Sequence, residues 1–139
     1  MERGDETMTN KRALIVDDEP DIVESIRFNL ELENIECIEA LDGEEALSKA
    51  RKENPDVIIL DIMLPKINGY KIARMLKFDE SYKHIPIIML TARAQQTDIK
   101  MGEETGADEY VTKPFDMDEL VGLVKKYLGL TIEDYEGKG

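Results

Sequence analysis

Short apolar runs alternate with helix-length amphipathic segments from residue 11 to residue 128. Apolar or alternating runs occupy residues 13–16, 36–40, 56–61, 85–90 and 109–112 and predict five strands. The run at residues 56–61 is apolar on both faces, which favours the centre of a sheet. In the run at residues 85–90, Pro86 stands near the start, where a missing backbone donor is tolerated.

Amphipathic segments separate these runs and predict five helices. The first begins at Pro20, and the second begins at Asp42 as a helix cap and ends at Asn54. The third follows the turn pair Asn68-Gly69, and the last spans residues 117–128. The fourth, at about residues 96–105, is the weakest because it has only two large apolar residues.

Alternating strands and helices indicate βαβ units, a parallel sheet and a single doubly wound α/β domain. We place this domain at residues 11–129, since residues 1–10 are polar and aperiodic and predict a disordered tail. Residues 130–139 read as an acidic tail or as the start of a linker.

Composition narrows the class of protein. Apolar residues make up 42% and charged residues 35% of the chain, as in a soluble globular protein. Without a signal peptide or a membrane-length apolar stretch, we expect a cytoplasmic protein with no membrane contact. The net charge of −13 disfavours direct binding to nucleic acid. The single cysteine, Cys37, excludes an intramolecular disulfide, and its alternating run favours a packed thiol over a reactive one.

Charged residues stand where several of the predicted strands end. Asp17 and Asp18 follow the first strand, Asp61 ends the third, and Lys113 follows the fifth. Chemistry in open α/β sheets lies beyond the carboxyl ends of the strands, so these side chains should meet in one cleft. Because three carboxylates at close range repel one another unless a cation joins them, the pattern predicts a metal site.

Five short motifs at these strand ends resemble the receiver domain of two-component response regulators, in one register from residue 11 to residue 128. They are Val16-Asp17-Asp18-Glu19, residues 60–65 with Gly69, Leu90-Thr91-Ala92, residues 106–110, and Lys113-Pro114-Phe115. Each motif is common by chance, but all of them in order form a specific signature. The resemblance implies a flavodoxin-like sheet of order 2-1-3-4-5.

The resemblance also implies roles for individual residues. Asp61 would be the nucleophile that accepts a phosphoryl group from the phosphohistidine of a sensor histidine kinase. The cofactor would be Mg²⁺, held by Asp17, Asp18, Asp61 and the backbone carbonyl of Met63. The phosphate would be bound by Lys113, Thr91 and Ala92, of which Lys113 and Thr91 also take part in catalysis.

The same resemblance implies a switch rather than a turnover enzyme, since the domain catalyses only its own phosphorylation and dephosphorylation. Thr91 and Tyr110 would be the switch residues, and the Lys113-Pro114 bond would be cis. The fourth helix, fifth strand and last helix would then present a changed face to an output protein or output domain, or to a second copy in a phosphorylation-dependent homodimer. Ile99 and Leu123 stand where regulators with winged-helix output usually carry basic residues, which weakens the case for that dimer.

Three alternatives stand beside this interpretation. Asp17 and Asp18 could simply cap the first helix. A flavodoxin-like binding protein would need hydroxyls and backbone donors after the first strand, where this chain has acidic residues and Pro20. A haloacid-dehalogenase-type phosphatase would need a second aspartate two residues after its nucleophile, where this chain has Met63.

Overall fold

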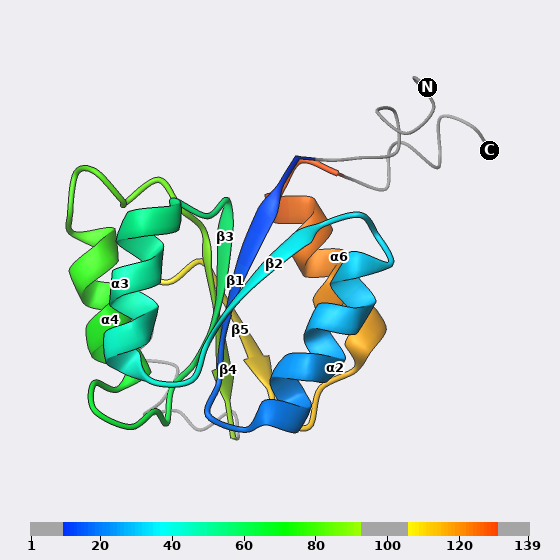
Figure 1. The fold of residues 1–139 in the computed structure, drawn as a ribbon, viewed down its shortest axis with the longest axis horizontal. Coiled ribbons are helices and arrows are strands. Elements are labelled where there is room, and N and C mark those ends of the chain that lie inside the picture. The colour runs from blue at the N-terminus through cyan, green and yellow to red at the C-terminus, as the bar shows by residue number, and fades with distance from the viewer. Residues whose placement is uncertain (1–9, 93–105, 131–139) are drawn as a thin grey trace.

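The computed structural model describes residues 10–92 and 106–130. Five parallel strands form one sheet of order β2-β1-β3-β4-β5, which confirms the predicted doubly wound topology (Figure 1). The strands are β1 (Arg12–Val16), β2 (Glu36–Ala40), β3 (Val57–Asp61), β4 (Ile87–Thr91) and β5 (Glu109–Thr112). The helices within the described ranges are α2 (Pro20–Glu31), α3 (Gly43–Glu53), α4 (Gly69–Lys77) and α6 (Met117–Tyr127).

The element boundaries follow the local signals with one notable difference. Strand β4 begins at Ile87, after Pro86, whereas the sequence predicted a start at residue 85. The amide of Ile85 donates to Tyr82 in the preceding turn, and Pro86 contributes only its carbonyl, which accepts from Ile58. Three predicted segments lie wholly or mostly outside the described residues: the helix at residues 96–105, the tail at residues 1–10, of which only residue 10 is described, and the tail at residues 130–139, of which only residue 130 is described.

Helices cover both faces of the sheet. Helices α3 and α4 lie on one face, and α2 and α6 lie on the other (Figure 1). Each face has its own apolar core: alternate strand residues such as Leu14 and Ile58 join α3 and α4, while Ile15 and Ile59 join α2 and α6. The central strand β3 is buried at all five residues, as its uninterrupted apolar run predicted. None of the described helices is long and apolar enough to cross a membrane.

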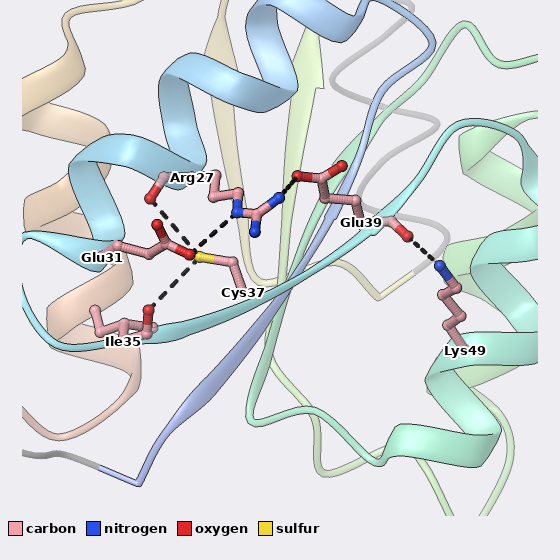
Figure 2. Close-up of polar contacts among 6 residues, drawn as sticks. All are labelled: Arg27, Glu31, Ile35, Cys37, Glu39 and Lys49. Atoms are coloured by element: carbon pink, nitrogen blue, oxygen red, sulfur yellow. Dashed lines mark hydrogen bonds and ion pairs between the residues drawn. The ribbon is translucent and has the colours of Figure 1, made fainter.

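Polar contacts tie the edge strand β2 to helices on both faces (Figure 2). The guanidinium of Arg27 in α2 pairs with Glu31 and with Glu39 of β2, and the ammonium of Lys49 in α3 donates to the Glu39 carbonyl at 2.7 Å. Beside Arg27, Cys37 is half-buried, and burial raises the pKa of its thiol to about 12. A thiol that stays protonated is a poor nucleophile, which agrees with the packing role expected of Cys37.

Candidate functional site

The carboxyl ends of four neighbouring strands bring the predicted site residues to one edge of the sheet, the lower edge in Figure 1. Asp17 and Asp18 follow β1, Asp61 is the last residue of β3, and Thr91 is the last residue of β4. Lys113 follows β5, and its amide donates to the Thr91 carbonyl at 2.6 Å. Parallel pairing in register therefore brings together, at one site, residues that are far apart in sequence.

Three carboxylates, those of Asp17, Asp18 and Asp61, lie together at this site. Asp17 is fully buried and Asp61 is 4% exposed, whereas Asp18 is exposed. One oxygen from each lies within 4.8 Å of the others. Oδ1 of Asp17 accepts from the amide of Glu19 at 2.9 Å, but its buried Oδ2 accepts no hydrogen bond of good geometry. The cluster offers hard oxygen donors, among them a buried Asp17 oxygen that has the ammonium of Lys113 beside it but accepts no well-aligned hydrogen bond. Such donors fit a small divalent cation such as Mg²⁺.

The helix-capping alternative for Asp17 and Asp18 does not fit this geometry. Glu19 is the N-cap residue of α2, and no side chain caps that helix end. The Asp17 side chain instead accepts a hydrogen bond from the amide of Glu19, two residues further along the chain. The two aspartates are therefore available for the carboxylate cluster.

Lys113 brings a positive charge within reach of these carboxylates. Its Nζ lies 2.9 Å from Oδ2 of Asp17, 3.4 Å from Oδ1 of Asp61 and 3.7 Å from a carboxylate oxygen of Glu19. Burial works against the charged ammonium, but the hydrogen-bonding and Coulombic pull of Asp17, together with Asp61, outweighs it and raises the pKa of Lys113. Glu19 was not among the predicted site residues, although its place directly after the two aspartates was a usable signal.

The pKa of the Asp61 carboxyl is unusually high for an aspartate. Burial, followed by repulsion from Asp17, raises its pKa to about 6, while Lys113 acts in the opposite direction. At neutral pH the Asp61 side chain is therefore mostly ionised, and its negative charge is destabilising because it is buried beside Asp17. A bound divalent cation would relieve that repulsion.

We expect Mg²⁺ to raise the melting temperature more at pH 7.5 than at pH 5.0. With a folded pKa near 6 and an unfolded value of about 3.9, Asp61 lowers stability as pH rises between these values. At pH 5.0 most Asp61 is protonated in the folded state, so binding the cation must displace a proton. Thermal unfolding by circular dichroism with MgCl₂, against NaCl of equal ionic strength, measures the difference. Equal shifts at the two pH values would contradict it.

The remaining predicted residues lie around this cleft. The Thr91 side chain is 2% exposed, and Ala92 next to it is exposed. Met63 lies in the loop after β3, and its side chain is mostly exposed. The Lys113-Pro114 peptide bond is cis.

Tyr110 lies on β5 opposite Met89, two residues before the register pair of Thr112 with Thr91. It is half-buried and packs against the core on the α3 and α4 side. Because strand side chains alternate between faces, Tyr110 and Thr91 are on the same face of the sheet. This shared face is the geometry that a paired movement of the two residues requires.

A glycine allows the start of α4 to lie close to the end of β3. A Cβ on Gly69, at the start of α4, would lie 2.3 Å from the Asp61 carbonyl, and the Gly69 amide donates to Ile62 at 2.8 Å. Asn68 caps the helix by accepting from Lys71 at 3.0 Å. The pair Asn68-Gly69, predicted as a turn, also fixes the exit of the loop that follows Asp61.

Comparison with known proteins identifies the same family that the sequence motifs resemble. The model of the response regulator receiver domain matches residues 13–125. Over 119 residues, the chain is 46% identical to the alkaline phosphatase synthesis transcriptional regulatory protein PhoP of Bacillus subtilis, covering 86% of this chain and 49% of that protein. Over 124 residues it is 46% identical to the phosphate regulon transcriptional regulatory protein PhoB of Pseudomonas aeruginosa, covering 89% and 54%.

Solved structures agree with these relatives. A putative response regulator from Chloroflexus aurantiacus superposes with a TM-score of 0.81 at 38% identity, covering 86% of this chain and 98% of that one. The receiver domain of the Francisella response regulator 1452 gives a TM-score of 0.80 at 32% identity, with the same coverage.

The chain spans about half the length of the curated relatives it matches. Those relatives are named as transcriptional regulators, and one from Synechocystis is named as DNA-binding. The expectation of no contact with nucleic acid therefore applies only to the part of the relatives that this chain matches. Fold, strand-end aspartates and family match together show that this chain belongs to the receiver domains of two-component response regulators.

Proposed function

We propose that Asp61 accepts a phosphoryl group from the phosphohistidine of a sensor histidine kinase. The observation that supports this most directly is a buried carboxylate with a pKa near 6, beside Asp17 and 3.4 Å from the ammonium of Lys113. A carboxylate oxygen would attack phosphorus, the P–N bond would break, and the imidazole would leave and take up a proton. The product is an acyl phosphate on Asp61.

The other cleft residues would act by position and charge, which dominate phosphoryl transfer. Asp17, Asp18 and the Met63 carbonyl would hold Mg²⁺ together with Asp61, and the bound ion would neutralise charge on the phosphoryl oxygens. Lys113 would exchange its ion pair with Asp61 for a phosphoryl oxygen. The Thr91 hydroxyl and the Ala92 amide would bind the remaining oxygens.

Output would follow from the same contacts. Engagement of Thr91 by the phosphate would favour an inward position of Tyr110, on the same face of the sheet, and so bias a pre-existing equilibrium. The changed surface would include β5 and α6 and would bind an output protein or domain. Because the relatives are transcriptional regulators, we propose transcription as the controlled process. Residues 11–129 would form the receiver unit, and the protein would be a switch rather than a turnover enzyme.

Incubation of the protein with acetyl phosphate and MgCl₂, followed by intact-mass measurement, tests this function. We expect the mass of one phosphoryl group to be added, and peptide mapping after reductive trapping to place it on Asp61. Chelation of the cation with EDTA should prevent the reaction. No adduct with acetyl phosphate or with a panel of phosphorylated histidine kinases would contradict the proposal, and sustained hydrolysis of a phosphomonoester would favour the phosphatase alternative.

A further inference from the structure

We propose that Gly43, the first residue of α3, positions the loop that carries the Met63 carbonyl and thereby sets the affinity for Mg²⁺. This inference rests on the proposed function of the cleft. Gly43 is a positioning residue, because the carboxylate cluster consists of Asp17, Asp18 and Asp61 and includes no residue of α3. Its influence must pass through the loop at residues 62–68.

The loop packs directly on the first turn of α3. The amide of Gly43 donates to the Pro65 carbonyl at 3.2 Å. A Cβ on Gly43 would lie 2.1 Å from the carbonyl oxygen and 2.6 Å from the Cβ of Ile67. Both distances are far below van der Waals contact, and backbone atoms cannot move aside by a change of rotamer. Any side chain at Gly43 must therefore push the loop away from α3.

Charge holds the same part of the loop against α3. Lys66 has a left-handed backbone, with a φ of 71°, which non-glycine residues adopt at a cost. Its ammonium lies 3.5 Å from Asp42 and 3.6 Å from Glu44, the two neighbours of Gly43. Because these groups are largely exposed, their attraction is weak, and the close backbone contact of Gly43 is the stronger constraint.

The two ends of the loop are fixed separately. At the entrance, the amide of Ile62 donates to the Leu90 carbonyl at 3.1 Å; at the exit, the Gly69 amide donates to the Ile62 carbonyl at 2.8 Å. Inside the loop, the Ile67 amide donates to Pro65 at 2.8 Å, so residues 65–67 move as a unit. Met63 lies between this unit and Ile62, in a turn closed by the Leu64 amide, which donates to the Ile62 carbonyl at 3.1 Å. We therefore infer that displacement of the unit strains this turn and moves the Met63 carbonyl, while Asp61 stays in its strand.

Gly43→Ala tests the inference, with Gly122→Ala as the matched control. Alanine is otherwise favourable in a helix, and a Cβ on Gly122 in α6 would meet no atom within 4 Å. We expect the Kd for MgCl₂, measured by isothermal titration calorimetry, to rise about 10-fold in Gly43→Ala, the size of effect seen when support of a metal ligand is lost. In Gly122→Ala it should equal the parent value. An unchanged Kd in folded Gly43→Ala would overturn the inference, even if its melting temperature fell.

A second variant keeps the test decisive if Gly43→Ala does not fold. Ile67→Ala removes the half-buried side chain that packs the loop on the core without introducing a clash. It should weaken Mg²⁺ binding several-fold, and parent-like affinity would overturn the inference. In either folded variant the phosphorylation rate should return to near the parent value at saturating Mg²⁺. If the parent itself neither binds Mg²⁺ nor gains a phosphoryl group, the proposed function fails. If the parent does both and the variants bind Mg²⁺ as tightly as the parent, the proposed function stands and only the role of Gly43 is rejected.

Discussion

Asp61→Asn is expected to abolish phosphoryl transfer and at the same time to stabilise the fold. The amide nitrogen and oxygen of asparagine cannot form an acyl phosphate, so no adduct should appear at any Mg²⁺ concentration. The substitution also removes a buried negative charge from beside Asp17. Since the pKa of Asp61 is raised from about 3.9 to about 6, its ionisation opposes folding at neutral pH. At about 1.4 kcal/mol for each pKa unit, we expect a gain of about 3 kcal/mol at pH 7.5 without metal.

The pH dependence of that gain identifies its cause. The gain should be nearly complete above pH 6 and should vanish only below pH 4, where Asp61 becomes protonated in both the folded and the unfolded state. Urea unfolding across this range measures it, and Asp21→Asn, an exposed aspartate in the first turn of α2, is the matched control. A destabilised Asp61→Asn at pH 7.5 would show that the electrostatic reading is wrong. Persistent phosphorylation of that variant would place the phosphoacceptor elsewhere.

Lys113→Ala should have the second largest effect, a loss of about 3 kcal/mol at pH 7.5 without metal. The substitution leaves the buried carboxylates of Asp17 and Asp61 without their shared cation, and an uncompensated buried charge is strongly destabilising. Mg²⁺ should restore part of the loss, because a divalent cation replaces the missing positive charge. Phosphorylation should slow at least 10-fold even with saturating Mg²⁺, since the phosphoryl oxygens lose a charge partner.

Lys125→Ala provides a matched control for this variant. The Lys125 side chain is 17% exposed and pairs with Glu33 at 2.9 Å, compared with 20% exposure and a 2.9 Å pair for Lys113. Its partner Glu33, in the turn after α2, is more exposed than the carboxylates of Asp17 and Asp61. Lys125→Ala should therefore lower the stability by about 1 kcal/mol, and Mg²⁺ should not change this loss. Equal losses in the two variants, or no recovery of Lys113→Ala with Mg²⁺, would contradict the proposed arrangement.

Local patterns were enough to predict the strands because each run is short and either apolar throughout or alternating. The run at Val57–Asp61 is buried on both faces, as expected for a central parallel strand. Strand-end chemistry was also predictable, since the carboxyl ends of parallel strands share one edge whatever the details of packing. The start of β4 was missed because Pro86 and the turn hydrogen bond of Ile85 act over only a few residues.

Sequence alone thus determined the fold class, the order of charged residues along the chain and the identity of the three clustered aspartates. Tertiary structure decided which charges meet at contact distance: Lys113 reaches Asp17 and Asp61 across the sheet, and its ammonium lies beside the buried Asp17 oxygen that accepts no well-aligned hydrogen bond. It also decided that Gly43 meets the backbone of Ile67. Periodicity reports which face of an element is buried, but distances between elements depend on packing in three dimensions, which no local pattern encodes.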